Sequence, residues 1–370
     1  MKINNKIPFV NAFALSLLAS FPWFLSAIGG YASNIKNEFI VSFLFISLAI
    51  LTMTFLAAKS VNRIDFNGDS YGKVTFYAII IINLFVLCGK IDLAYKYDFQ
   101  LGTIRHYYFN DVGKSVVFFG SSLYEAFYNK VIIPATMILF ILPTKNKKEY
   151  LIAFFIFLMS SILVGGRFFI YEFAVITLCK ALISGRVISY KLIFSFLLII
   201  LSFFVIANRL GLDIFDGFLY IFRQVLNYHV IQLPILSDYQ SFQKVLAPFV
   251  GIETLVYFLF GYTPPETILA EQVQFIEKYA YNGDGPFNAF ATSLAYFFPV
   301  YGVEFGSLIF IFSIASFLMF LLFVFRNNRA EVVILFIFVL FFSAFSPFVF
   351  SFQFFLYIIF FALGLTRIKK

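Results

Sequence analysis

Phe39–Ala58 reads FIVSFLFISLAILTMTFLAA, a run of 20 residues without a charged side chain. As an α-helix this run spans about 30 Å, the thickness of the hydrocarbon core of a bilayer. Further apolar runs lie near Pro8–Gly30, Val74–Gly89, Ser121–Leu142, Tyr150–Gly165, Phe168–Ile183, Leu192–Asn208, Val303–Phe325, Val332–Ser346 and Phe348–Leu365. The pattern predicts an all-α polytopic membrane helix bundle with about ten transmembrane helices.

The composition excludes an ordinary soluble domain. Hydrophobic residues make up 62% of the chain and charged residues 12%, and the mean hydropathy is +0.93. Phenylalanine alone supplies 58 of the 370 residues, which indicates lipid-facing side chains more than recognition sites. The two cysteines, Cys88 and Cys179, fall at different depths of their spans, so we expect no disulfide and no metal site.

The basic residues indicate how the chain crosses the membrane. Alternate short connectors and the two termini hold Lys2, Lys6, Lys59, Arg63, Lys73, Lys145, Lys147, Lys148, Lys180, Arg186, Lys191, Arg326, Arg329, Arg367, Lys369 and Lys370. Positive connectors stay in the cytoplasm, so both termini are expected there. The overall charge of +8 therefore reflects topology, and no nucleic-acid partner is expected.

One long polar segment, residues 209–302, is expected on the outer side. Its net charge is −4, because four basic residues face eight acidic ones. Two apolar pieces inside it, Val245–Phe260 and Phe287–Val300, are predicted as interfacial or re-entrant helices; if both crossed, an acidic stretch would become cytoplasmic. The predicted organisation is an N-terminal bundle of about seven helices (1–208), a large outer lid (209–302) and about three C-terminal helices (303–370).

Candidate anion-binding residues lie at the expected outer surface. Gly165–Gly166–Arg167 ends a span there, and Arg209 and Arg223 flank a predicted helix at the start of the long segment. Guanidinium groups bind phosphate bidentately, so these three arginines are candidates for a diphosphate. The competing interpretation is that they only anchor helix ends at the interface.

Candidate bases and sugar contacts accompany these arginines. His229 is suited to general base catalysis, and Glu304 either activates a hydroxyl or stabilises the start of a helix. Tyr228, Asn288 and Tyr301 are candidate sugar contacts, since tyrosine offers both an apolar face and a hydroxyl group. Glu125 and Lys130 lie inside one apolar run and are expected to pair with each other or with a ligand. Glu172 follows Arg167 by five residues, and these two are expected to form either a structural or a functional pair.

The sequence contains no P-loop, zinc-ligand spacing, Gly-x-Ser-x-Gly elbow or dinucleotide fingerprint. This argues against nucleotide hydrolysis and against a cytosolic nucleotide sugar as donor. No cofactor is expected.

Three motifs, with the arrangement of the spans, resemble the Wzy family of O-antigen polymerases. They are Gly165–Gly166–Arg167, Asn288–Ala289–Phe290–Ala291–Thr292 and Tyr301–Gly302–Val303–Glu304–Phe305–Gly306. In the last motif Glu304 stands where the family pattern has aspartate, so the carboxylate is kept. The resemblance covers the plan of the whole chain, including one dominant outer loop in its second half.

The resemblance implies a metal-independent glycosyltransferase of the bacterial inner membrane in lipopolysaccharide biosynthesis. Such enzymes join oligosaccharide repeat units carried on undecaprenyl diphosphate at the periplasmic face, among membrane lipids, with a chain-length regulator as a possible partner. Arg167, Arg209 and Arg223 would hold the diphosphate, and His229 and Glu304 would be the candidate bases. The alternatives are an O-antigen ligase and a flippase of lipid-linked oligosaccharide, a transporter.

The predicted topology is tested by Asn282→Cys in a cysteine-free background. We expect this cysteine to react with an impermeant thiol reagent in intact spheroplasts, because the predicted lid faces outward. Labelling that appears only after lysis would show instead that Val245–Phe260 and Phe287–Val300 both cross.

Overall fold

The structure is a computed structural model, and it is all-helical wherever it describes the chain. The described residues are 6–32, 36–62, 73–108, 110–143, 147–164, 168–184, 197, 200–201, 204–205, 207–208, 211–213, 215–220, 294, 297–344 and 352–365. They form no strand; the one β-type contact among them is an isolated bridge between Lys6 and Asn62. The predicted helical class is confirmed.

The helices follow the predicted apolar runs. Their bounds are α1 (Phe9–Ala32), α2 (Asn37–Ser60), α3 (Lys73–Lys96), α4 (Leu101–Tyr108), α5 (Asp111–Val117), α6 (Ser122–Phe127), η1 (Tyr128–Ile132), α7 (Ile133–Ile141), α8 (Lys147–Leu163), α9 (Phe168–Ile183), α15 (Phe298–Val324), α16 (Arg329–Ser343) and α17 (Phe352–Leu365). The bounds of α9 coincide with the prediction, and α2 extends the predicted run by two residues at each end.

Four of the described helices are long and apolar enough to cross a membrane. They contain the windows Phe9–Gly29, Asn37–Ser60, Thr75–Lys96 and Tyr301–Val324. Membrane character is thereby supported, whereas the count of about ten spans and the outer position of residues 209–302 stay predictions. Of the two predicted interfacial helices, Val245–Phe260 lies outside the described residues, and so does most of Phe287–Val300.

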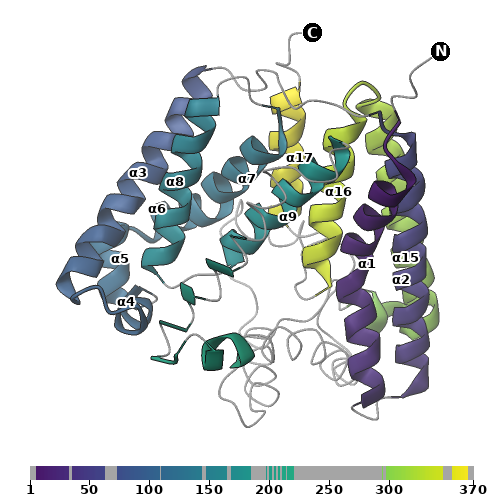
Figure 1. Cartoon of the computed structure of the whole chain (residues 1–370), viewed down its shortest axis with the longest axis horizontal. Helices are drawn as coiled ribbons and strands as arrows, with labels where there is room; N and C mark the ends of the chain where they lie inside the picture. Colours follow the sequence, from purple (N-terminus) through teal and green to yellow (C-terminus); the bar gives the residue numbers. More distant parts are fainter. Residues whose placement is uncertain are drawn as a thin grey trace. The chain divides into compact units, whose positions relative to one another are not determined.

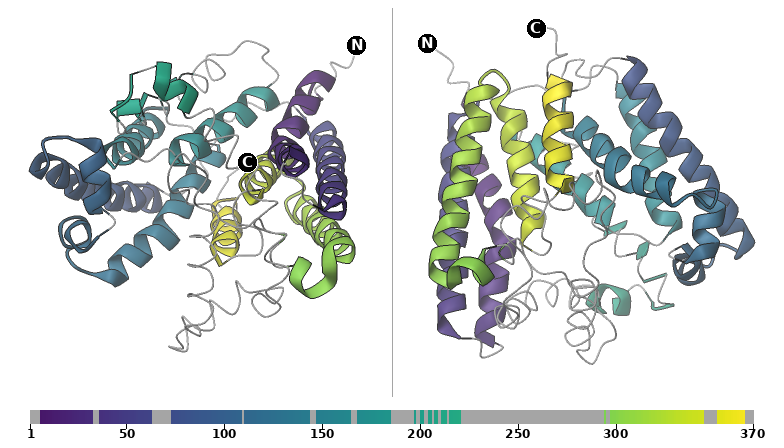
Figure 2. Two further views of the ribbon diagram at one scale, coloured as in Figure 1. Left: turned by 90° about the horizontal axis from the view of Figure 1, so that it is seen from below. Right: turned by 180° about the vertical axis from the view of Figure 1, so that it is seen from behind.

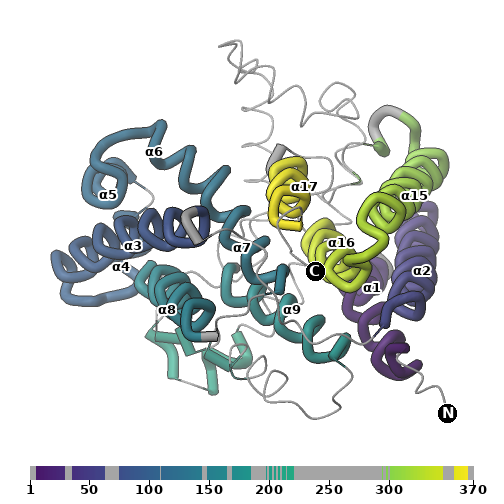
Figure 3. Tube along the Cα trace, turned by 90° about the horizontal axis from the view of Figure 1, so that it is seen from above, coloured from purple at the N-terminus to yellow at the C-terminus, as the bar shows by residue number. Residues whose placement is uncertain are grey.

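The chain divides into two compact units, and the first consists of 1–63 and 223–355. Within it, α1 and α2 are antiparallel neighbours, with α15 beside α2 and α16 beside α1 (Figures 1 and 3). The single tryptophan, Trp23, is fully buried between Phe43 of α2 and Phe310 of α15, with ring centroids 5.9 and 5.5 Å away. An aromatic core therefore holds these helices together.

The second unit consists of 64–222 and 356–370. Within it, α3 runs beside α8, and the short helices α4 and α5 follow the end of α3 (Figures 1 and 2). A buried polar network joins Asn83 of α3 to η1 and α7. The Asn83 amide donates to Thr136 Oγ1 of α7 at 3.1 Å, and the Tyr128 hydroxyl of η1 donates to Asn83 Oδ1 at 3.1 Å. Because each group has a partner, this network stabilises the unit in an apolar surrounding.

The helix from Ser122 to Ile141 contains a π-turn, η1. The Ile133 N–H donates to the carbonyl of Tyr128, five residues earlier, where an α-helix would join residues four apart. Pro134 follows directly and has no N–H to donate, so the ordinary ladder is interrupted at this place. The wider turn places Tyr128 in the buried network with Asn83.

Sequence and structure differ at the end of α3. The predicted span stops at Gly89 because Lys90 and Asp92 break the apolar run, but the helix continues to Lys96. After it, α4 and α5 pack on α3 around a hydrophobic cluster that includes Leu93, Ile104 and Val117. Gly89 permits this contact, since a Cβ there would lie 2.8 Å from the Cα of Val117. Residues 97–108 and 110–121 thus form a folded segment, which we call the aromatic cap.

Short helices end against side chains from other helices. The indole N–H of Trp23 donates to the carbonyl of Leu340 in the last turn of α16, at 3.0 Å. Lys180 Nζ of α9 donates to the carbonyl of Leu142, directly after α7, at 3.0 Å. The last carbonyls of a helix have no N–H partner within that helix, and in hydrocarbon no water replaces it.

Replacing Trp23 with phenylalanine tests this role. The substitution leaves the buried Leu340 carbonyl without its donor, so we expect the free energy of unfolding to fall by about 1–3 kcal/mol. The measurement is the thermal unfolding midpoint of the purified protein in detergent. Phe21→Leu on the same helix is the control, because Phe21 is 54% exposed and a change there costs no more than about 0.5 kcal/mol. Equal midpoints for Trp23→Phe and wild type would contradict the role.

Candidate functional site

Two of the predicted site residues lie among the described residues, Tyr301 and Glu304. The others lie outside them: the candidate diphosphate ligands Arg167, Arg209 and Arg223, the candidate base His229, and the candidate sugar contacts Tyr228 and Asn288. Their predicted roles stay predictions.

Glu304 lies just after a break in α15. Gly302 has φ 75° and ψ 173°, a conformation that only glycine adopts readily, and it divides a short first turn from the long helix. Gly306 makes this fold-back possible, since a Cβ there would lie 2.9 Å from Phe298 Cδ1 and 3.1 Å from the carbonyl carbon of Phe297. The two glycines of the predicted motif therefore shape the chain around Glu304.

The surroundings of Glu304 fit both of its predicted roles. Its side chain is exposed, and no described residue donates a hydrogen bond to its carboxylate. A negative charge in the first turn after a helix start is favourable, which supports the structural role. The exposed carboxylate is equally accessible to a ligand hydroxyl. Tyr301, on the other side of the break, is 39% exposed.

A second candidate site occurs at the C-terminal end of α8, around Lys90. Lys90 lies on α3 and is only 3% exposed. Its Nζ donates to the carbonyl oxygen of Ser160 at 3.1 Å and to Ser160 Oγ at 2.8 Å, in the last turn of α8. The third side of Nζ faces two rings, with the centroid of Tyr108 at 5.1 Å and that of Tyr128 at 5.8 Å. Cation–π contacts of this kind stabilise a desolvated ammonium group.

No carboxylate balances Lys90 among the described residues, where the one ion pair joins Lys96 to Asp92 on the exposed surface. Burial first, and then the carboxylate of Glu125, raise the pKa of the Tyr108 phenol above its ordinary range. Tyr108 therefore stays neutral at physiological pH. An ionisable side chain in an apolar bundle without a counter-ion is a candidate for ligand binding.

Arg105 joins Lys90 at the same end of α8. Its guanidinium donates to the carbonyl of Val164 at 3.4 Å, one helical turn after Ser160. Val164 is followed in the sequence by Gly165–Gly166–Arg167, and Phe168 then begins α9. Two cationic side chains thus contact the end of α8 directly before the predicted ligand Arg167. We call Lys90, Arg105 and their contacts Ser160 and Val164 the α8 cation site.

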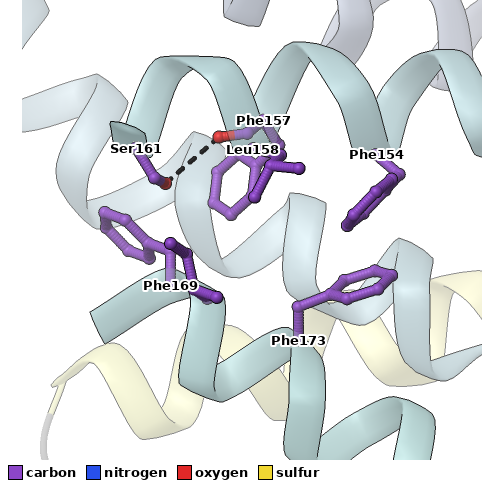
Figure 4. A pocket seen from close by; sticks show the side chains of 7 residues that line it. Phe154, Phe157, Leu158, Ser161, Phe169 and Phe173 are labelled. Atoms are coloured by element: carbon purple, nitrogen blue, oxygen red, sulfur yellow. Dashed lines mark hydrogen bonds between the residues drawn. The ribbon is translucent and has the colours of Figure 1, made fainter. Parts of the chain in front are cut away.

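A small space, nearly filled by its own lining, lies between α8 and α9 (Figure 4). Six of its seven lining residues are apolar: Phe154, Phe157, Leu158, Phe169, Ile170 and Phe173. The seventh is Ser161, whose hydroxyl donates to the carbonyl of Phe157 at 3.1 Å. Phe169 lines the pocket and also packs against the cluster that contains Tyr128 and Tyr108. The lining of this space is therefore almost wholly apolar.

The pairings predicted for the buried charges are resolved in part. Glu125 and Lys130 form no ion pair among the described side chains, and Lys130 is exposed. Glu172 of α9 is 2% exposed, and its Oε2 has no hydrogen-bond partner. Its predicted neighbour Arg167 lies outside the described residues.

Sequence reasoning missed Lys90 and Tyr108. Lys90 was placed just beyond a span, although the signal for a continuing helix is present in Ile91, Leu93 and Ala94. Its partner Ser160 is 70 residues away in the sequence, so no local pattern indicates the contact.

The comparisons with known proteins give no neighbour for this fold or site. No family model, no curated protein and no solved structure matches the chain.

Replacing Gly302 with alanine tests the break in α15. Because the backbone conformation of Gly302 is strained for every other residue, we expect a loss of about 1–3 kcal/mol in unfolding free energy. The thermal unfolding midpoint reports it. Phe312→Leu on the same helix is the control, since Phe312 is 73% exposed. An unchanged midpoint for Gly302→Ala would mean that α15 is continuous through this residue.

Proposed function

We propose that the chain is a membrane glycosyltransferase that polymerises oligosaccharide repeat units carried on undecaprenyl diphosphate, an O-antigen polymerase. The observation that supports this most is the α8 cation site, in which two basic side chains contact the end of α8 and Arg167 follows in the sequence. Basic side chains at this place suit a ligand with an anionic head group.

The proposed reaction transfers a growing glycan from one lipid carrier to another. A hydroxyl oxygen of the acceptor sugar forms a bond to the anomeric carbon of the donor glycan, and the bond from that carbon to the diphosphate oxygen breaks. Undecaprenyl diphosphate leaves with the electron pair, and the hydroxyl proton passes to a base. Cationic groups stabilise the negative charge that develops on the leaving diphosphate.

The residues divide into two proposed roles. Arg167, Arg209 and Arg223 bind the diphosphate, with Lys90 and Arg105 contributing to the positive field. His229 and Glu304 are the candidate bases, and the exposed carboxylate of Glu304 is compatible with this role. Tyr228, Asn288 and Tyr301 contact sugars. The enzyme is proposed to work at the outer face of the bacterial inner membrane, with both termini in the cytoplasm.

Deleting the gene in its host and separating the surface polysaccharide on a gel tests the function. Loss of a polymerase should leave lipid A–core that bears a single repeat unit, because ligation and export continue. Bare core would indicate a ligase or a flippase instead, and unchanged long chains would exclude all three activities.

Complementation of the deletion strain tests the predicted arginines. Arg223→Ala should give no long chains at a normal protein level, and Arg223→Lys shows whether charge alone is sufficient, since lysine lacks the bidentate geometry. The matched control is Arg326→Ala in a predicted cytoplasmic connector, which should restore the full ladder. A full ladder from Arg223→Ala would remove this residue from the site.

A further inference from the structure

Glu172 of α9 is a buried carboxyl group to which the proposed reaction gives no role. Glu172 is 2% exposed, and its Oε2 has no hydrogen-bond partner among the described residues. We infer that Glu172 is a proton-binding site, in which the carboxyl group holds a proton and stays neutral while the second unit is folded. The inference does not depend on the proposed function, because it concerns the charge of one buried group and no step of the glycosyl transfer.

The first argument is what a charge would meet at this place. A carboxylate away from water is costly unless a cation or several hydrogen-bond donors compensate it. In the described part of the chain the one ion pair joins Lys96 to Asp92, and no donor reaches Glu172 Oε2. A bound proton removes the charge and needs no cavity, so it is the ligand that this buried oxygen can take.

The second argument is the composition of the surrounding helices. On α9 itself, the described side chains one turn from Glu172 are Phe169, Val175 and Ile176, which are all apolar. Both α7 and α8 pack against α9. The sequence of α7 contains no titratable residue, and the titratable residues of α8 all lie in its first turn, Lys147–Tyr150. Across α7, and along α8 after its first turn, no side chain can therefore balance a charge on Glu172.

The third argument is the position of Lys180, the one lysine of α9. It lies eight residues after Glu172, which corresponds to about 12 Å along the helix. Its Nζ donates to the carbonyl of Leu142 at 3.0 Å and lies 5.5 Å from the ring centroid of Tyr150. The positive charge of Lys180 is thus bound at the other end of α9.

The other titratable side chains near Glu172 are acids. Tyr357 of α17 interacts electrostatically with Glu172, and Tyr171 and Cys179 lie on α9 itself. A phenol or a thiol becomes negative when it loses a proton, so none of them compensates a carboxylate. All three are compatible with a neutral carboxyl group.

An ionised Glu172 would need a cation other than a proton. A metal ion takes several ligands, and the described residues contain no group of three His, Cys, Asp or Glu side chains that could provide them. Arg167, five residues before Glu172, lies outside the described residues. An ion pair between Arg167 and Glu172 is therefore the outcome against which the inference is tested.

Infrared spectroscopy of the full chain tests the inference, in a maltoside detergent because its molecules contain no carbonyl group. A protonated carboxyl group has a C=O stretching band that carboxylates and side-chain amides lack. At about pH 8 exposed carboxyl groups are ionised, so the band reports buried neutral ones. We expect Glu172→Gln to remove a band from the wild-type spectrum. The matched control Glu38→Gln, at an exposed residue of α2, should leave that band in place.

Denaturant titrations at a series of pH values provide a second measurement. Above about pH 5 the unfolded chain releases the Glu172 proton while the folded chain keeps it, so rising pH favours unfolding. We expect the folding equilibrium constant of wild type to fall about tenfold per pH unit relative to that of Glu172→Gln. Glu172→Met, which is also neutral, takes its place in both measurements if Glu172→Gln fails to fold.

An ion pair with Arg167 would reverse these results. The wild-type spectrum would then lack a band that depends on Glu172, and Arg167→Gln would make this band appear. Wild type and Glu172→Gln would also share one pH dependence of unfolding above about pH 5, because Glu172 would be ionised in the folded and the unfolded chain alike. Either outcome overturns the inference.

Discussion

The structure depends on one constraint: a helix that ends inside an apolar bundle must find donors for its last carbonyls. In the described residues these donors are side chains from other helices. Trp23 donates to a carbonyl in the last turn of α16, and Lys180 donates to the carbonyl directly after α7. Lys90 and Arg105 donate to carbonyls at the end of α8. Each contact fixes where a short helix ends and which neighbour it packs against. In the first two cases structure alone explains the contact. At α8 two basic side chains donate to carbonyls one turn apart, so the same constraint has produced a candidate binding site.

Much of the fold follows from the sequence because hydropathy is a local property. The run Phe168–Ile183 is the helix α9 itself, and Phe39–Ala58 differs from α2 by two residues at each end. The predicted span from Val74 ends at Gly89 because Lys90 interrupts the apolar run. In the structure, contacts with residues distant in the sequence keep Lys90 inside the helix, and hydropathy does not register such contacts. The packing of α5 on α3 depends on the close approach at Gly89, which hydropathy does not encode.

The candidate site was predictable only in part. The motif from Tyr301 to Gly306 is visible in the sequence, and the structure shows what its glycines do. Gly302 breaks the helix, and Gly306 leaves room for the preceding turn to fold back. Glu304, between them, is exposed. The pairing of Lys90 with Ser160 joins segments that are distant in the sequence, so neither residue type nor spacing signals it.

The π-turn η1 has a consequence for how this protein could vary between related chains. A π-turn holds one residue more than the α-helical turn it replaces, so deleting one residue between Tyr128 and Ile132 would restore a regular α-helix. The wider turn takes up its extra residue within one turn, so the helix faces before and after it would keep nearly the same directions once that residue is removed. What would change is the turn itself, which carries Tyr128 and its hydrogen bond to Asn83. A one-residue gap there in an alignment would therefore mark chains that keep the helix faces of α6 and α7 and build this buried contact differently.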